Sequence, residues 1–212
     1  MIVSHEHGFV FMKTRKTAGT SVEIALSRVC GPDDVITPVL EEALRLETGG
    51  RGPQNFEAPP LERKAFNHMP VSMVRRMLGR RRFESYFSFA IERNPWDAVV
   101  SLYHWHVRDL GEPPAFAAYA ASEAVETFAA KQQRIYRLDG RVAVDRVLRY
   151  ESLADELAEV WAGLGLPGSP DLPHAKAGVR PRASYRDYYD AASRDRVADL
   201  FAGPIEDLGY EF

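Results

Sequence analysis

Apolar runs and amphipathic stretches alternate along this chain, which predicts that strands and helices follow one another. Residues 9–14 predict a buried strand that leads through a short loop into a helix over 21–29. The strongest strand signal covers 86–92, where aromatic and β-branched residues partly alternate with polar ones. The helix after it has apolar residues at positions i, i+3, i+4 and i+7 counted from Trp96, which form one buried face. The pattern therefore contains two strand-loop-helix units.

The rest of the chain continues this alternation. Weaker patterns predict a helix over 38–46, a strand over 64–69 with a helix from there to 78, an alanine-rich helix over 113–131, a strand over 142–150, a helix between Ser152 and Gly165 and a last helix over 193–202. Glycines and prolines between 49 and 60 predict a long surface loop. We therefore predict an α/β fold in which residues 1–212 form a single domain, with a mainly parallel central sheet flanked by helices.

Composition and charge limit the classes of function. The chain has 212 residues, of which 45% are hydrophobic and 27% charged, as in soluble globular proteins. The formal net charge of −3 gives no overall attraction to nucleic acid, so we expect no such partner and any anion site must be local. Cys30 is the only cysteine, which excludes an internal disulfide framework and a cysteine-rich metal site. No stretch approaches the ~20 apolar residues that span a bilayer, so we expect a cytoplasmic protein without a membrane segment.

The loop after the first strand has the chemistry of an anion-binding turn. Residues 20–23 match a capping box, with a hydroxyl at the helix entrance and a carboxylate three residues on. The first N–H groups of such a helix point into the loop, where Lys13, Arg15 and Lys16 add positive charge. A Walker loop has its lysine directly before the helix, whereas Lys16 precedes Gly19, which argues against an ordinary P-loop NTPase. The alternative is an ordinary strand-to-helix turn with a solvated basic edge.

A second anion-binding arrangement follows the strongest strand. Asn94 is a favourable N-cap and Pro95 a favourable first helical residue. Arg93 therefore leaves the strand beside another helix N-terminus. Ser101 lies almost two turns into this helix, on the face that it shares with Asp97. The alternative is that Arg93 pairs with a neighbouring carboxylate such as Glu92 or Asp97.

Three further groups are candidates for binding or catalysis. His68 ends the run at 64–69, where open α/β sheets place their ligand crevice, or else it caps a helix through hydrogen bonds. The arginines between 75 and 82 form a basic cluster that is either solvated or in contact with a polyanionic acceptor. Cations and tyrosines interleave between 172 and 190 in a pattern that suits a nucleotide, although a surface loop anchored by its tyrosines would look the same.

Two motifs, taken together, resemble a known family. K-T-A-G-T-S at 16–21 resembles the 5′-phosphosulfate loop of sulfotransferases that use 3′-phosphoadenosine 5′-phosphosulfate (PAPS). R-N-P-W-D-A-V-V-S-L-Y at 93–103 looks like their 3′-phosphate motif, in which a serine follows the arginine by eight residues. The likeness is greatest to the branch that includes Golgi carbohydrate sulfotransferases and small bacterial relatives. It extends, more weakly, to 66–72, to 147–153 and to the tail at 185–212.

The resemblance implies a P-loop-like sulfotransferase fold and a reaction. PAPS would donate its sulfuryl group to a hydroxyl of a carbohydrate or a small metabolite, leaving adenosine 3′,5′-bisphosphate. Lys16 would neutralise the charge that grows on the oxygen bridging sulfate and phosphate. His68 is the base that we expect, with Glu6 and His104 as alternatives. In-line transfer of this kind requires no metal.

The same resemblance implies which residues bind the donor. Loop N–H groups and hydroxyls would hold the 5′-phosphate, Arg93 and Ser101 the 3′-phosphate, with two late arginines in reserve. The full expected set is Arg15, Lys16, Thr17, Ala18, Gly19, Thr20, Ser21, Arg93, Ser101, Arg180 and Arg182. Arg15 stands where many relatives have proline, so its guanidinium is expected to touch the sulfate or an acidic neighbour. Lys176 and Gly178 stand where relatives tend to carry Asn and Ser.

Two other functions would use the same residues. A nucleotide kinase or NTPase would need Mg²⁺ and a Walker lysine, which this loop lacks. A non-catalytic nucleotide-binding protein would keep the fold without turnover. Stabilisation by adenosine 3′,5′-bisphosphate without magnesium would separate the sulfotransferase from the kinase.

Overall fold

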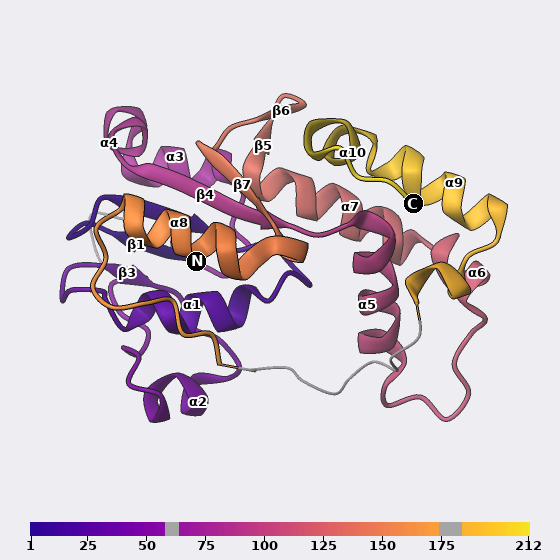
Figure 1. Ribbon diagram of the computed structural model, residues 1–212, viewed down its shortest axis with the longest axis horizontal. Helices are drawn as coiled ribbons and strands as arrows, with labels where there is room; N and C mark the ends of the chain where they lie inside the picture. Colours follow the sequence, from indigo (N-terminus) through magenta and orange to yellow (C-terminus); the bar gives the residue numbers. More distant parts are fainter. Residues whose placement is uncertain (58–63, 174–183) are drawn as a thin grey trace.

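A five-stranded sheet is the centre of the fold in residues 1–57, 64–173 and 184–212, which the computed structural model describes (Figure 1). The strand order is β3-β1-β2-β4-β7, with bounds Val35–Ile36, Ile2–Ser4, Phe9–Met12, Phe87–Glu92 and Arg146–Arg149. The β2–β4 and β4–β7 pairs are parallel, whereas β1 runs antiparallel to both β2 and β3. The sheet is therefore mixed, and its parallel part contains the two predicted strand-loop-helix units.

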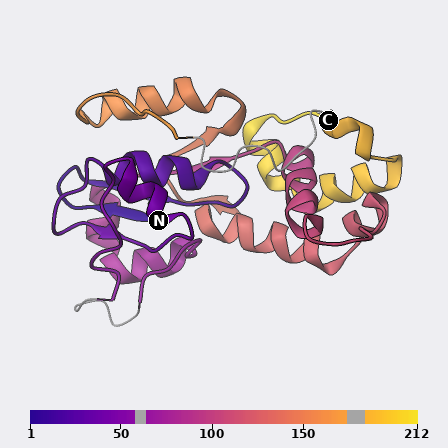
Figure 2. The same cartoon turned by 90° about the horizontal axis from the view of Figure 1, so that it is seen from below.

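Helices cover both faces of this sheet, as Figures 1 and 2 show. On one face, α1 (Gly19–Ser27) and α8 (Leu153–Gly163) bury Leu26 and Leu157 against the phenylalanines of β2 and β4. On the other face, α3 (Val71–Leu78) and α7 (Glu123–Tyr136) bury Val74 and Ile135. The predicted α/β fold with flanking helices is confirmed.

A separate helical layer lies beyond the carboxyl end of β4, at the right of Figures 1 and 2. It contains α5 (Pro95–Val107), α6 (Phe116–Ala120), the start of α7, η2 (Tyr185–Tyr188), α9 (Ala191–Leu200) and α10 (Ala202–Leu208). Trp96, Phe116, Phe128 and Phe201 are among the residues of its apolar core. The C-terminal tail returns to the sheet, because the Tyr210 hydroxyl donates to the Glu92 carbonyl oxygen at 3.1 Å.

Several predicted boundaries need correction. The alanine-rich stretch forms two helices, α6 and α7, and the strand expected over 142–150 divides into β6 (Arg141–Val142), which pairs with β5 (Arg137–Leu138), and β7. Between them, the Asp145 carboxylate accepts hydrogen bonds from the Ser88 N–H at 2.7 Å and the Ser88 hydroxyl at 2.6 Å, so it ties β7 to β4. The helix expected over 38–46 is shorter and begins later, as α2 (Glu42–Glu47). Residues 64–69 are not a strand, because His68 has a φ of 62°.

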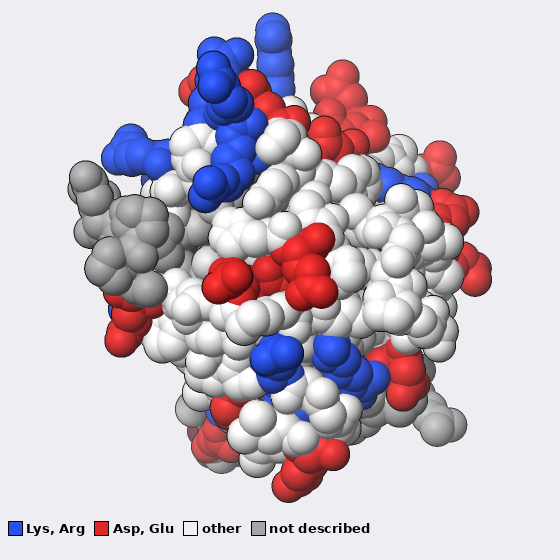
Figure 3. Space-filling view, turned by 90° about the vertical axis from the view of Figure 1, so that its left-hand side faces the viewer, with Lys and Arg blue, Asp and Glu red and all other residues white. Residues whose placement is uncertain are grey.

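The basic cluster lies away from the carboxyl ends of the parallel strands. Arg75 and Arg76 end α3, and α4 (Arg80–Ser85) adds three exposed arginines. Figure 3 views the side of the molecule that is at the left of Figure 1, and it shows basic side chains gathered at the top. Because α4 leads into the first residue of β4, these arginines sit at the opposite end of that strand from Arg93. They are therefore not part of the two predicted anion-binding loops.

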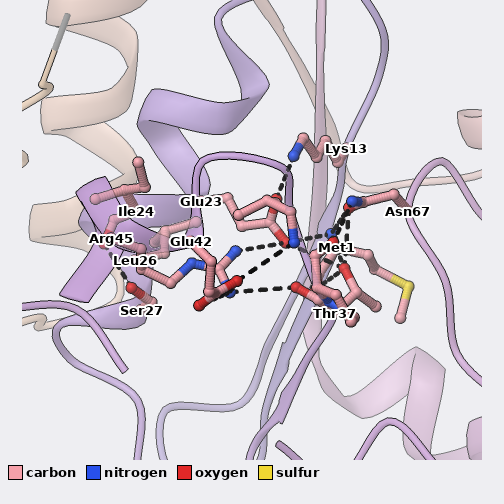
Figure 4. Close-up of polar contacts among 12 residues, drawn as sticks. Met1, Lys13, Glu23, Ile24, Leu26, Ser27, Thr37, Glu42, Arg45 and Asn67 are labelled. Atoms are coloured by element: carbon pink, nitrogen blue, oxygen red, sulfur yellow. Dashed lines mark hydrogen bonds and ion pairs between the residues drawn. The ribbon is translucent and has the colours of Figure 1, made fainter. Parts of the chain in front are cut away.

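A buried cluster of charges holds α1 against the sheet (Figure 4). The Glu23 carboxylate accepts hydrogen bonds from the Lys13 ammonium at 2.5 Å and from the Met1 ammonium at 2.7 Å. A guanidinium nitrogen of the fully buried Arg45 lies 3.5 Å from the same carboxylate. Burial opposes ionisation of this carboxyl, but the Met1 ammonium and Lys13 hold the pKa of Glu23 below its ordinary value. One carboxylate thus holds three buried basic groups together.

The predicted capping box is therefore wrong. Helix α1 begins at Gly19, two residues before the predicted start, and its N-cap is Ala18 in the left-handed conformation. Thr20 is then inside the helix, and Glu23 turns inward to Lys13 instead of back to the helix entrance. The Thr-x-x-Glu spacing matched a capping box by coincidence, because the carboxylate serves a tertiary contact.

Replacement of Glu23 by Gln should destabilise the fold strongly. The substitution leaves Lys13 buried without its carboxylate and Arg45 with Glu42 alone, and removing one partner of a buried pair costs about 3–5 kcal/mol. Urea denaturation followed by circular dichroism measures the free energy of unfolding. Glu42→Gln is the control, because the Glu42 side chain is 28% exposed where it pairs with Arg45 and should cost less than about 1 kcal/mol. Equal losses in the two variants would contradict this account of the cluster.

Candidate active site

The two predicted anion-binding loops lie next to each other at one edge of the sheet. In the parallel β2–β4 pair, Met12 is in register with Ala90, so both loops leave the sheet on the same side. Arg93, just after β4, donates from Nη1 to the backbone carbonyl oxygen of Lys16 at 3.1 Å. The structure therefore joins two motifs that are 77 residues apart in the sequence.

The first loop has an unusual backbone. Lys16 and Ala18 have φ angles of 63° and 57°, a conformation that costs free energy for residues with a Cβ. A Cβ on Gly19 would lie 2.9 Å from Lys13 Cγ, so only glycine fits where the loop passes the lysine side chain. Helix α1 has no side-chain cap at Ala18, which leaves its first N–H groups facing the loop. This geometry suits an anion.

The hydroxyl groups of the loop have different surroundings. Thr17 is fully buried, and its Oγ1 lies 2.8 Å from Thr14 Oγ1, which itself donates to the Ile91 carbonyl oxygen of β4. These two hydroxyls therefore fasten the loop to the sheet. Thr20 and Ser21 are 7% and 9% exposed, at the first turn of α1.

The basic side chains of the loop point in different directions. Lys13 is turned inward to Glu23. Lys16 is half-buried, with its ammonium nitrogen 4.8 Å from the centre of the Trp105 ring. The Arg15 Nε is buried and has no hydrogen-bond partner among the described residues, and burial lowers the pKa of this guanidinium. An unpaired buried donor is costly, so Arg15 is suited to an anionic ligand.

Arg93 lies directly before the N-cap of α5, and Ser101 lies within that helix, one turn beyond Asp97. The Asn94 side chain caps this helix by accepting from the N–H groups of Trp96 and Asp97, so the predicted cap is confirmed. The Arg93 guanidinium makes contacts of 2.6 and 2.7 Å with the Asp97 carboxylate and lies 4.2 Å from the Tyr150 ring centre. The ion pair considered from the sequence therefore forms. These contacts and the bond to the Lys16 carbonyl use three of the five N–H donors of Arg93.

His68 is anchored beside the first loop. Its Nδ1 lies 2.9 Å from the backbone carbonyl oxygen of Lys13, and because a carbonyl only accepts, Nδ1 carries the proton. Burial lowers the pKa of His68 to about 3, with nearby Arg15 and Lys13 contributing to the shift. The neutral ring then has its lone pair on Nε2, the tautomer that a general base needs.

Glu6 and His104, the two alternatives to His68 as general base, lie in other parts of the fold. Glu6 lies in the turn between β1 and β2, at the opposite end of β2 from the loop. His104 Nε2 lies 2.8 Å from the Tyr188 hydroxyl oxygen, in the helical layer. Arg180, Arg182, Lys176 and Gly178 lie outside the described residues.

The sequence indicated Glu92 only as a possible partner of Arg93, and it did not indicate the partners that this buried carboxyl has on α7. Glu92, the last residue of β4, accepts hydrogen bonds from Gln132 Nε2 at 3.0 Å and from the Tyr136 hydroxyl at 2.8 Å. Burial raises the pKa of Glu92 to about 7. Gln132 also contacts the backbone of Arg15. The sequence pattern gave no sign of this role for Gln132, because its partners come from distant segments.

Neither a membrane-spanning helix nor a metal-holding group of side chains occurs in the part of the chain that the structure describes. In residues 1–57, 64–173 and 184–212, no helix is long and apolar enough to cross a membrane. Within the same ranges, no group of three or more His, Cys, Asp or Glu side chains is placed to hold a metal ion.

Comparisons with known proteins give one family. The family model described as "Sulfotransferase family" matches residues 1–201. A protein of Archaeoglobus fulgidus, described as uncharacterized, is 32% identical over 106 residues, which are 49% of this chain and 88% of the relative. The crystal structure of a sulfotransferase from Alicyclobacillus acidocaldarius aligns over 97% of this chain and 96% of its own, with 20% identity and a TM-score of 0.43.

Proposed function

Because the chain belongs to the sulfotransferase family, we propose that it moves the sulfuryl group of PAPS to an acceptor hydroxyl of a carbohydrate or a small metabolite. The observation that carries this proposal is the junction of the two loops, where Arg93 Nη1 donates to the Lys16 carbonyl oxygen at 3.1 Å. A donor with phosphates at both its 5′ and 3′ positions needs two anion sites on one surface. At this junction the two candidate anion sites lie next to each other.

The first loop is suited to the 5′-phosphosulfate. The uncapped N–H groups at the start of α1 and the helix dipole favour negative charge. The unpaired Nε of Arg15 adds a donor that burial has already removed from water. Thr20 and Ser21 place hydroxyls on the first turn of α1. We propose that these groups hold the 5′-phosphate and the sulfate together with Lys16.

The second loop is suited to the 3′-phosphate. Arg93 has two N–H donors beyond those that bind Asp97 and the loop, and an arginine presents them in a fork that matches phosphate oxygens. Ser101 lies one turn beyond Asp97 on α5 and adds a hydroxyl. A 3′-phosphate contact would distinguish PAPS from ATP, whose ribose lacks that group.

The transfer itself depends on position and charge. PAPS supplies a sulfuryl group on a phosphate leaving group, and in-line attack by the acceptor oxygen breaks the bond to the bridging oxygen. We propose that Lys16, whose ammonium nitrogen lies 4.8 Å from the centre of the Trp105 ring, neutralises the charge that develops there. His68 accepts the hydroxyl proton at Nε2, because Nδ1 is committed to the Lys13 carbonyl oxygen. The anionic donor should raise the low pKa of His68.

Adenosine 3′,5′-bisphosphate should stabilise the protein without magnesium. The physical reason is that both loops bind phosphate through N–H, hydroxyl and guanidinium groups. A thermal-shift titration, run with the bisphosphate in the presence of a chelator and with Mg-ATP, measures the effect. Stabilisation by Mg-ATP alone would contradict the proposed donor and favour a kinase or NTPase.

Replacement of Lys16 by Ala should lower kcat about 10²–10³-fold, the range found when one preorganised donor to a developing charge is removed. Bisphosphate binding should be largely retained, because the other loop groups remain. The measurement is transfer from labelled PAPS to a mixture of hydroxyl compounds, with calorimetric titration of the bisphosphate. Lys131→Ala, an exposed lysine on α7, is the matched control. Full activity in the Lys16 variant would remove the mechanism.

Replacement of His68 by Asn should lower kcat about 10²–10⁴-fold, the usual contribution of a general base. It should also remove the acidic limb of the pH–rate profile, while donor affinity stays close to that of the wild type. His5→Asn is the control, because that ring bonds to the Tyr86 hydroxyl near the other end of β2. A pH–rate profile that is the same in wild type and the His68 variant would count against His68 as the base.

A further inference from the structure

The side-chain amide of Gln132 spans the gap between the first loop and β4. Its Oε1 accepts from the Arg15 backbone N–H at 2.8 Å, and its Nε2 donates to the Arg15 backbone carbonyl oxygen at 3.2 Å. The same Nε2 donates to Glu92 Oε1 at 3.0 Å. Gln132 is fully buried on α7, 117 residues away from Arg15 in the sequence. One side chain therefore pairs both peptide groups of a loop residue, as a neighbouring strand would.

The orientation of this amide is fixed by its partners. A glutamine amide has two N–H donors, and the Arg15 carbonyl and Glu92 occupy one each. If the amide were flipped, its NH₂ would face the Arg15 N–H, and its oxygen would face a carbonyl oxygen and a carboxyl oxygen. Each of these contacts would be repulsive in a buried site. The amide therefore imposes one position on the Arg15 backbone.

Glu92 extends the connection to the second loop. Its Oε1 also accepts from the Arg93 backbone N–H at 3.0 Å, and the Tyr136 hydroxyl holds its other oxygen at 2.8 Å. Gln132 and Tyr136 are one turn apart on α7, so this helix fixes both ends of the contact. The backbone of Arg15 and the backbone of Arg93 are thus tied to one carboxyl through a single amide.

Arg15 stands where the loop becomes strained. Its neighbour Lys16 has a φ of 63°, which an isolated chain would avoid. Strain of this kind persists only where the surroundings fix the backbone. Residue 15 is the last before the strained turn, and Gln132 holds both its N–H and its carbonyl.

We propose that Gln132 is a positioning residue that keeps the first loop in its donor-binding shape and aligns it with Arg93. That the loop binds a donor rests on the proposed function, whereas the control of its backbone does not. Gln132 acts through Arg15 and Glu92 and does not touch the reacting atoms.

Gln132→Glu is the sharpest variant, because it keeps the size of the side chain and removes both N–H donors. The new carboxylate would face the Arg15 carbonyl oxygen and Glu92, so the loop should be pushed out of place. Gln133→Glu is the matched control. Gln133 also donates from Nε2 to a backbone carbonyl oxygen, that of Leu200 at 2.9 Å, but it faces α9 and not the loop. Gln132→Met, a neutral variant of similar length, covers the case in which a second buried carboxyl prevents folding.

Hydrogen exchange of the ligand-free protein reads the loop backbone directly. We expect faster exchange at residues 15–18 in the Gln132 variants than in the wild type or in Gln133→Glu, with exchange in β2 unchanged. Circular dichroism confirms that each variant is folded. Unchanged exchange at 15–18 in the folded Gln132 variants would overturn the proposal, whether or not the protein transfers sulfate.

Kinetics with PAPS provide the second readout. In Gln132→Glu we expect kcat/KM for PAPS to fall at least about tenfold, which corresponds to 1.4 kcal/mol, while KM for the acceptor stays unchanged. This loss of kcat/KM should shrink as the pH is lowered from about 8.5 to about 6. The introduced carboxyl and that of Glu92 then share a proton, which restores a hydrogen-bond donor. A loss that is equal in Gln133→Glu, or independent of pH, would show a merely structural role. If the wild type transfers no sulfate while exchange changes as expected, the proposed function fails and the positioning role stands.

Discussion

Parallel pairing of β2 with β4 places Met12 beside Ala90, so that two loops leave the sheet at neighbouring points. Each loop leads into a helix, and each helix presents its N-terminus to the same edge. Arg93 then closes the gap with a hydrogen bond to the Lys16 carbonyl oxygen. The site depends on this register, because a shift of one residue would turn the side chains of β2 to the opposite face. Everything that we propose for the donor follows from two loops held at one edge.

A buried ion pair decides which basic residues of the first loop serve the fold. The Glu23 carboxylate accepts a hydrogen bond from Lys13, and the cluster that these two residues form with Arg45 fixes α1 on the sheet. Lys13, which the sequence analysis counted as part of the anion site, therefore stabilises the fold, and Arg15 and Lys16 are the basic residues of this loop that we propose for the donor. The same loop is held by the hydrogen bond from His68 to the Lys13 carbonyl oxygen and by the two bonds of Gln132 with the N–H and the carbonyl oxygen of Arg15. Fold and site are thus built from one set of contacts.

Local signals in the sequence predicted what local forces decide. The apolar runs of β2 and β4 and the Asn94-Pro95 start of α5 needed only neighbouring residues to be recognised, and each is present in the structure. The role of Glu23 could not be predicted, because its partners come from distant segments and its spacing imitated a helix cap. The role of Gln132 depends on a contact across 117 residues. The left-handed backbone of Lys16 and Ala18 could not be predicted either, because neither residue is a glycine and tertiary contacts impose the conformation.

The most direct test of the central claim is whether one nucleotide uses both loops. Calorimetric titration with adenosine 3′,5′-bisphosphate and with adenosine 5′-monophosphate, both without magnesium, isolates the 3′-phosphate. The account predicts that wild type binds the bisphosphate at least about tenfold more tightly, a difference of 1.4 kcal/mol. It also predicts that Ser101→Ala reduces this preference while its affinity for the monophosphate stays the same. Equal affinity of the wild type for the two nucleotides would contradict it.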